Sequence, residues 1–248
     1  MIAAEERVRA ACEQRAARAE RLAEGSDSAG AVLRFAAGLW RVQADMAAKV
    51  GEFDSIAAAA RPLLTYVSSR GPAELAAAAR AALDSAPAFA ARVAGYRAGG
   101  EFDYLARAAL SPWAAVQREK GALIGSGSGP CPSCGGVPWT ASRRSGGELE
   151  GAVRMLHCAA CWGAWQIPRI KCPACGEENP EKLPNFGDPA HAGARIEACD
   201  SCKGYLKSID LTDDARRIPE VDDLASIALD LWASEQGYER LEPGLAGI

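Results

Sequence analysis

Eight cysteines, arranged as four C-x-x-C pairs between Cys131 and Cys202, are the residues whose type and spacing point most directly to chemistry. The two residues inside each pair form a tight knuckle, so that both sulfurs can reach one ion at about 2.3 Å while nearby amides hydrogen-bond them. Gly135 and Gly176 directly follow the second cysteine of two pairs and supply the positive φ that such knuckles use. The pattern predicts two tetrathiolate metal sites.

An offset of 41 residues maps the first half of the cysteine region onto the second without a gap. The residues around the cysteines are also similar in the two halves, since R-M-L-H-C-A-A-C from Arg154 matches R-I-E-A-C-D-S-C from Arg195. Each copy holds C-x2-C, 23 intervening residues and C-x2-C, close to the spacing of zinc ribbons and rubredoxin-like sites. If each copy is self-sufficient, it binds its own metal, while pairing across the copies stays open. The predicted ligands are Cys131, Cys134, Cys158 and Cys161 in the first copy, and Cys172, Cys175, Cys199 and Cys202 in the second.

Several roles are compatible with these sites. Spacing does not distinguish iron from zinc, because both accept tetrahedral thiolate coordination. Each copy has few apolar residues, so a structural metal would contribute on the order of 10 kcal/mol to its folding, and a redox or metal-sensing role is the alternative. Four cysteine ligands leave no open position for substrate, and the sequence has no nucleophile elbow or kinase signature. We therefore expect a protein that is not an enzyme.

Three further residues could be read as functional. His157 precedes Cys158, but four cysteines already complete that site, so His157 is expected beside the site or at the surface. His191 lies in a polar loop without an evident partner. Cys12, the ninth cysteine, falls in a predicted helix and is expected to be packed.

The elements before the cysteines are predicted to be helical, because residues 1–124 are rich in Ala, Leu and Arg and have no alternating β-branched run. The clearest helix begins near Ser28 and carries an apolar stripe at helical spacing. Further helices are expected at 3–24, 54–68, 73–84, 88–98 and 102–120, and Pro112 after Ser111 suggests a division of the last one. The stripe consists of Val32, Phe35, Leu39, Val42 and Met46.

The elements around the cysteines are predicted to be short strands, at 137–140, 152–157, 164–170, 194–198 and 204–210. A C-terminal amphipathic helix is expected from the spacing of Leu224, Ile227, Leu231 and Tyr238. The fold class is therefore α+β, with an N-terminal helical bundle, two tandem rubredoxin-like or zinc-ribbon modules and a C-terminal helix. The predicted parts are a helical domain at 1–124, a linker at 125–130, metal ribbons at 131–171 and 172–212, and a helix and tail at 213–248.

The charge distribution and the lack of long apolar segments indicate which partners and which compartment to expect. The formal net charge is −4, and residues 131–212 carry nine basic and nine acidic side chains before thiolate charge is added. This balance argues against a nucleic-acid partner, which would attract a basic surface. The first residues mix acidic and basic side chains without an apolar core, and no segment reaches membrane-spanning length. We expect a cytoplasmic protein, where thiols stay reduced, without membrane insertion.

The ordered set of motifs resembles the formate dehydrogenase accessory proteins of the FdhE type. The strings R-M-L-H-C-A-A-C-W-G-A-W, C-D-S-C-K-G-Y-L-K and D-D-L-A-S-I-A-L-D-L-W-A-S-E-Q-G-Y carry the resemblance, which is strong over about 130–240. It implies a cytoplasmic maturation factor, or chaperone, that binds the formate dehydrogenase catalytic subunit, forms dimers and holds iron in two rubredoxin-like sites of four cysteines each. Zinc is the alternative metal. A rubredoxin-like redox protein, a dithiol exchanger and a nucleic-acid-binding zinc ribbon are the alternative functions.

Overall fold

Helices fill the first half of the chain, as predicted. The computed structural model describes residues 3–26, 29–49, 51–122, 130–145 and 152–247, so the predicted linker at 125–130 lies outside the described residues apart from Pro130. The helices are α1 (Ala4–Glu24), α2 (Gly30–Ala47), α3 (Ile56–Ala59), α4 (Arg61–Arg70), α5 (Ala73–Asp84), α6 (Ala86–Arg97) and α7 (Tyr104–Glu119), with a 3-10 turn, η1 (Phe53–Ser55), before α3.

Small side chains allow these helices to approach closely. Alanines of α1 and α2, among them Ala19 and Ala36, lie in the main hydrophobic core together with Trp40. Gly38 of α2 meets α4, where the hydroxyl of Tyr66 donates to the carbonyl of Phe35 at 2.9 Å. A Cβ at Gly38 would lie 2.1 Å from the Tyr66 oxygen, so only glycine leaves room for this contact.

The predicted division of α7 at Pro112 is wrong, and the structure supplies the reason. Proline has no N–H to donate to the carbonyl of Ala108, one turn earlier. Gln43 of α2 donates its side-chain amide to that carbonyl at 2.8 Å, so the orphaned acceptor is satisfied and the helix continues. At the start of α7, Asp103 accepts from the N–H of Ala106 and pairs with Arg92, which fixes where the helix begins.

One sheet contains both copies of the cysteine repeat. Its strands lie in the order β3-β2-β1-β6-β5-β4, and β7 pairs with β6. The 41-residue offset maps β2 onto β5 and β3 onto β6, so each copy is a three-stranded antiparallel unit. The parallel pairing of β1 with β6 joins the copies edge to edge. The strands are β1 (Pro138–Ser145), β2 (Ala152–Cys158), β3 (Ala164–Gln166), β4 (Asn185–Gly187), β5 (Ala194–Ala198), β6 (Gly204–Asp210) and β7 (Glu239–Arg240).

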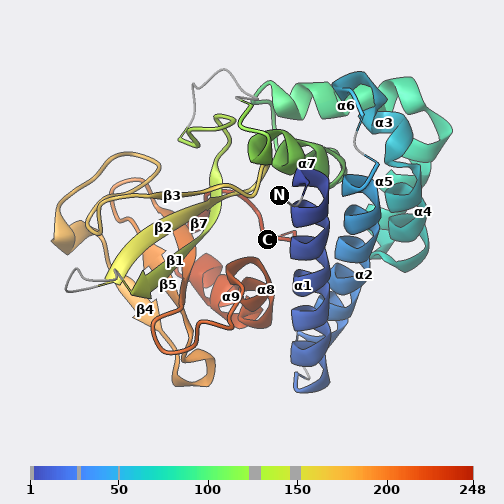
Figure 1. Ribbon diagram of the computed structural model, residues 1–248. Coiled ribbons are helices and arrows are strands. Elements are labelled where there is room, and N and C mark those ends of the chain that lie inside the picture. The colour runs from blue at the N-terminus through green and yellow to red at the C-terminus, as the bar shows by residue number, and fades with distance from the viewer. Residues whose placement is uncertain (1–2, 27–28, 50, 123–129, 146–151, 248) are drawn as a thin grey trace.

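The C-terminal segment connects the sheet to the helices. It is helical, as predicted, although the predicted helix is divided at Ser226 into α8 (Pro219–Ala225) and α9 (Ile227–Glu235). Leu231, predicted on its apolar face, is 55% exposed. Figure 1 shows α8 and α9 between the sheet and α1. The ion pair between Arg15 of α1 and Glu220 of α8 is buried and ties the two halves together.

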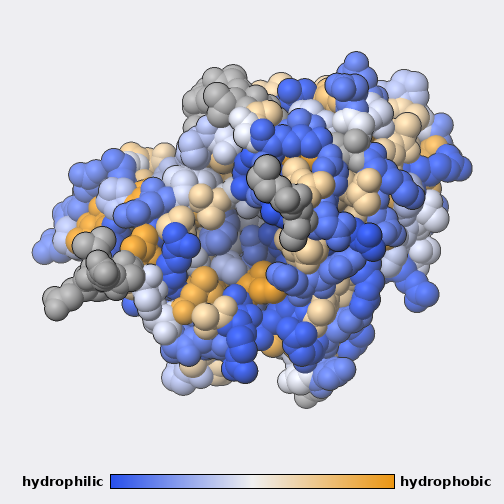
Figure 2. Space-filling view, viewed as in Figure 1, coloured by the Kyte–Doolittle hydropathy of each residue, from blue (hydrophilic) through white to orange (hydrophobic). Residues whose placement is uncertain are grey.

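The predicted α+β class is confirmed, with an N-terminal helical part, a sheet with two cysteine clusters and a helical C-terminal segment. Figure 2 shows mostly hydrophilic residues over α1 and α2, while hydrophobic ones reach this face mainly over the sheet and α8–α9. Among the helices of the described ranges, none combines the length and apolarity needed to cross a bilayer.

Candidate metal centres

The first cysteine cluster lies at the end of the sheet where β1 begins and β2 ends. The sulfurs of Cys131, Cys134, Cys158 and Cys161 all lie within 4.8 Å of one another. Cys131 Sγ is 3.7 Å from Cys161 Sγ, and Cys134 Sγ is 3.4 Å from Cys158 Sγ. Four thiols from two knuckles therefore converge on one point.

The second cluster repeats this arrangement where β5 ends and β6 begins. The sulfurs of Cys172, Cys175, Cys199 and Cys202 also lie within 4.8 Å of one another. Cys172 Sγ is 3.8 Å from Cys202 Sγ, and Cys175 Sγ is 3.6 Å from Cys199 Sγ. The sulfurs group within each copy and not across the copies.

Both clusters fit a tetrahedral metal ion. A metal–sulfur distance of about 2.3 Å at tetrahedral angles places neighbouring sulfurs about 3.8 Å apart. The four separations given above, 3.4–3.8 Å, are close to that value, and the other sulfur pairs in each cluster lie within 4.8 Å. They are also far longer than the 2 Å or so of a disulfide. Each of the two four-cysteine clusters could bind a metal ion, and the donor set suits zinc and iron equally.

The four knuckles share a backbone conformation that the sequence revealed only in part. One residue after each second cysteine has a positive φ: Gly135 (72°), Trp162 (54°), Gly176 (79°) and Lys203 (60°). This turn directs an N–H back to the carbonyl of the first cysteine, as in the 2.8 Å bond from Lys203 to Cys199. The glycines were predicted, but Trp162 and Lys203 are not residue types that signal a positive φ. Their position could have identified them, because each directly follows the second cysteine of its pair, as Gly135 and Gly176 do.

Backbone amides also support the sulfurs directly. The N–H of Gly136 donates to Cys134 Sγ at 3.3 Å, and the N–H of Gly204 donates to Cys202 Sγ at 3.4 Å. Such bonds favour the thiolate form, which is the form that binds metal. A Cβ at Gly136 would lie 3.0 Å from Cys158 Sγ, so glycine keeps this side of the first cluster open.

The first cluster is part of the main hydrophobic core. Three of its four cysteines are buried, and all three belong to the core that the helices build. Arg118 of α7 donates to the carbonyl of Cys161 at 3.2 Å, and the Ser111 hydroxyl reaches the carbonyl of Ala159 at 3.4 Å. Trp162 lies 4.6 Å from the guanidinium of Arg15, in a cation–π contact with α1. The first cluster thus joins the sheet to the helical half.

The second cluster is open to solvent. Cys175 and Cys202 are exposed, while Cys172 and Cys199 are buried. None of these four cysteines belongs to a hydrophobic core cluster of the described residues. Two copies of one sequence pattern therefore have different surroundings: the first is enclosed by helices, and the second reaches the surface.

None of the three remaining candidate residues belongs to the groups of converging ligand atoms found among the described residues. His157 points toward α8, with Nε2 at 2.8 Å from the Ser142 hydroxyl and Nδ1 at 3.7 Å from Glu220. Burial lowers the pKa of His157, which keeps the imidazole neutral. His191 is half-buried in a 3-10 turn. Cys12 is fully buried, and burial raises the pKa of its thiol to about 11, which makes it unreactive.

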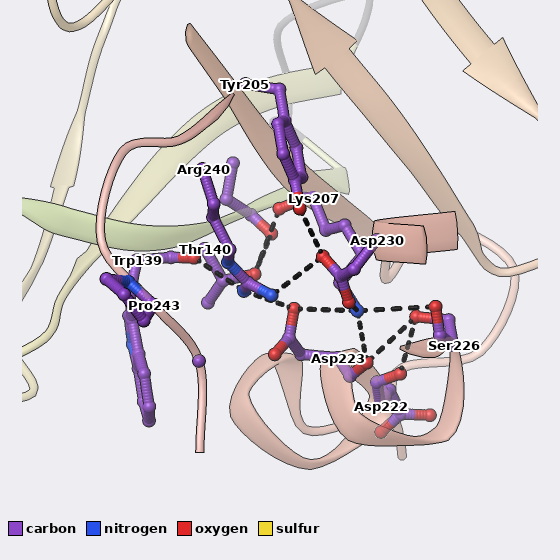
Figure 3. Close-up of polar contacts among 12 residues, drawn as sticks. Trp139, Thr140, Tyr205, Lys207, Asp222, Asp223, Ser226, Asp230, Arg240 and Pro243 are labelled. Carbon is purple, nitrogen blue, oxygen red and sulfur yellow. Dashed lines mark hydrogen bonds and ion pairs between the residues drawn. The ribbon is translucent and has the colours of Figure 1, made fainter. Parts of the chain in front are cut away.

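A buried charge network lies behind the sheet and fixes the C-terminal segment (Figure 3). Lys207 of β6 is fully buried, with Nζ at 2.5 Å from Asp230 and 3.2 Å from Asp223. Arg240 reaches the same two carboxylates at 2.9 and 2.6 Å and donates to the carbonyl of Trp139 on β1. Two cations and two anions balance each other, and they connect β1, β6, α8, α9 and β7. Single-residue patterns gave no sign of this network.

Comparisons with known proteins agree with the cysteine pattern. Residues 170–245 match the family model described as FdhE, C-terminal domain. The chain is similar to an FdhE homolog of Aquifex aeolicus, at 37% identity over 117 residues, which covers 47% of this chain and 41% of that protein. It is 40% identical to an FdhE homolog of Pseudomonas aeruginosa over 162 residues, covering 59% of this chain and 52% of that one. The matched region thus spans about half the length of these curated relatives.

The structural comparison extends over the whole chain. The crystal structure of the FdhE protein from Pseudomonas aeruginosa matches with a TM-score of 0.72 at 25% identity and covers 99% of this chain and 96% of that one. The similarity therefore includes the helical half, which lies outside the region of about 130–240 where the sequence motifs resemble FdhE-type proteins strongly. The predicted resemblance to FdhE-type proteins is confirmed.

Proposed function

We propose that this FdhE-like chain is an accessory factor for the assembly of formate dehydrogenase and binds the immature catalytic subunit of that enzyme. One observation carries the proposal: the chain shares the fold of an FdhE protein over 99% of its length and places its eight repeat cysteines in two clusters of four. The role itself comes from the FdhE-type resemblance. Clusters with four cysteines leave no coordination position for substrate, which supports a binding protein over an enzyme.

The eight cysteines are proposed as the ligands of two metal ions. Iron in both sites follows from the rubredoxin-like character of the resemblance, and zinc is the alternative because it accepts the same four thiolates. Bound metal would supply the cross-link that each small unit needs in order to fold. We further propose that residues 1–124, 131–171, 172–212 and 213–248 act as the helical, first metal, second metal and C-terminal parts of the protein.

A cytoplasmic location suits the free thiols. Nine cysteines are unpaired, and two of those in the second cluster are exposed, so an oxidising compartment would endanger the site. We also propose a homodimer, because the resemblance to FdhE-type proteins implies one.

The experiment is affinity capture with the full chain from cells that express formate dehydrogenase. We expect the catalytic subunit among the captured proteins, and we expect formate dehydrogenase activity to fall when the gene for this chain is deleted. A serine variant of the four second-cluster cysteines is the matched comparison, because it leaves the core-embedded first cluster intact. Unchanged activity after deletion, together with no captured subunit, would refute the proposal.

Electron transfer is the second candidate function, because the exposed thiols of the second cluster could give a metal there direct electronic contact with a partner. Elemental analysis and visible spectra of protein purified without oxygen test it. Two irons with a visible band that bleaches reversibly on reduction would support this candidate. Two zincs and no colour would eliminate it.

A further inference from the structure

A groove of about 300 Å³ runs along the face of the sheet that faces away from α8 and α9. The alternation of side chains along β6 separates the two faces, since Leu206 lines the groove whereas Lys207 joins the buried network near α8. Segments 169–173 and 180–185 form its walls. Cys172 and Cys199 of the second cluster also line it, so the groove lies directly beside the solvent-open metal site.

Basic side chains outnumber acidic ones in the described lining of this groove, which we call the basic groove. Among these residues Glu197 is the acidic one. The basic residues are Arg143, Arg154, Arg169, Lys171 and Arg195.

Two of these cations share one carboxylate. Arg154 extends from β2 across β1 and β6 and places Nε 2.8 Å from Glu197 on β5. Arg195 reaches the other oxygen of Glu197 at 2.6 Å. Arg154 also donates to the carbonyl of Lys171 at 2.7 Å, which holds the wall of the groove. One positive charge is therefore left uncompensated at the floor.

The outer cations are paired weakly or have no partner. Arg169 is exposed and has no hydrogen bond or ion pair to any residue of the described ranges. Lys171 pairs with Glu178, a side chain that is 64% exposed, so solvent screens this contact. Arg143 lies 3.7 Å from Asp210. Among the described residues, five cations thus face three carboxylates, which leaves an excess of two positive charges there.

The groove also has apolar surface. Ile170 on its wall is 51% exposed, and Leu183, Pro184 and Leu206 line it further in. The described part of the lining offers no exposed aromatic ring on which a base could stack, since the one aromatic residue in that part, Tyr205, is buried. Basic and apolar side chains that line one groove together suit a peptide with acidic and apolar side chains better than a nucleic acid or a small anion.

We propose that the basic groove binds an extended acidic peptide segment of a partner protein. The proposal rests on the proposed function in one respect: the partner would be the catalytic subunit of formate dehydrogenase. A segment bound there would lie against the cysteines of the second cluster, so partner binding and the state of that site would be coupled.

The test combines a defined peptide with capture of the subunit. The probe is a short fluorescein-labelled peptide of alternating Glu and Leu, and its binding to the metal-loaded full chain is measured by fluorescence anisotropy. Peptides in which Gln or Lys replaces Glu are controls for charge. Arg169→Glu should weaken binding of the acidic peptide about tenfold, because a desolvated attraction becomes a repulsion, and Arg169→Gln should weaken it less. Arg70→Glu, the same charge change at an exposed position of α4, is the matched control and should bind like the unchanged protein.

Each outcome decides between the two proposals. Equal binding of the Gln or Lys peptide, or tighter binding of a single-stranded oligonucleotide, would overturn the basic groove as an acidic-peptide site. Capture of the catalytic subunit by the unchanged chain and equally by Arg169→Glu would also overturn it, while leaving the accessory function in place. Groove-dependent peptide binding without capture of the subunit would support the groove and count against the proposed function.

Discussion

Replacing Lys207 by methionine should destabilise the protein by about 3–5 kcal/mol, the range seen when one partner of a buried ion pair is removed. The side chain is fully buried, and its Nζ contacts two carboxylates, Asp230 at 2.5 Å and Asp223 at 3.2 Å. In the variant Arg240 alone would face both carboxylates, and the network would carry an uncompensated negative charge. Methionine replaces the apolar stem of lysine and lacks only the terminal ammonium, so the loss reports charge and hydrogen bonding more than packing.

The second step is to restore charge balance. Asp230→Asn alone should carry a similar penalty, because two cations would then share Asp223. In the double variant the pair between Arg240 and Asp223, at 2.6 Å, remains balanced. We therefore expect the double variant to lose about 3 kcal/mol less than the sum of the single losses, a coupling typical of residues in one network.

Guanidinium unfolding of the metal-loaded proteins, followed by circular dichroism, provides the free energies of this cycle. Burial raises the pKa of Asp230, so the folded state takes up a proton at a pH where the unfolded chain does not. The penalty of Lys207→Met should consequently shrink as the pH falls toward that raised pKa. Arg216→Met, which breaks an ion pair at the surface, is the control and should leave stability unchanged. Strictly additive losses, or a Lys207→Met loss below about 1 kcal/mol, would refute the reasoning.

Three further predictions follow from the same structure. A chelator should remove metal from the solvent-open second cluster before the core-embedded first one, and metal release measured with a colorimetric chelator should show two phases; a single phase would contradict the difference in burial. Gly38→Ala should cost about 2–3 kcal/mol in urea unfolding because its Cβ would meet Tyr66, whereas Gly95→Ala, which meets no atom within 4 Å, should be neutral or gain about 0.5–1 kcal/mol. Burial raises the pKa of Asp103, but the bonds from Arg92 and from a backbone N–H outweigh burial and hold that pKa below its usual value. Asp103→Asn should therefore lose about 1 kcal/mol of stability above about pH 4, and this loss should vanish as the pH falls through the lowered pKa. A difference in stability that does not depend on pH would contradict this.

Local sequence patterns predicted the elements well where one pattern governed an entire element. α1, α2 and α5 lie within a few residues of their predicted ranges, because an alanine-rich amphipathic sequence strongly favours a helix. The buried face of α2 was predicted less well. Val32 and Phe35 of the predicted stripe are only half-buried, whereas Ala36 and Ala37 are buried. Close helix contacts favour small residues, which a search for large apolar side chains overlooks.

Tertiary contacts decided what the sequence left undetermined. α7 passes Pro112 because Gln43, 65 positions from Ala108 in the chain, supplies the missing donor. β4 and β7, which were not predicted, are strands of three and two residues that exist because longer neighbours pair with them. The repeat shows which cysteine pairs correspond but leaves pairing across the copies open, and the structure groups the sulfurs within each copy. That these cysteines bind metal remains a prediction.

The difference between the two clusters is the feature that the repeat conceals most completely. Equal spacing gives both copies equal knuckles, but the first cluster lies in the main hydrophobic core, where Arg118 of α7 donates to the carbonyl of Cys161. Loss of metal there would open the main core, so this site is suited to holding the fold. The second cluster has two exposed thiols and adjoins the basic groove, so a change in its surroundings would cost little stability. The same sequence pattern therefore occurs once inside the main hydrophobic core, where it suits a structural role, and once at the surface beside the basic groove.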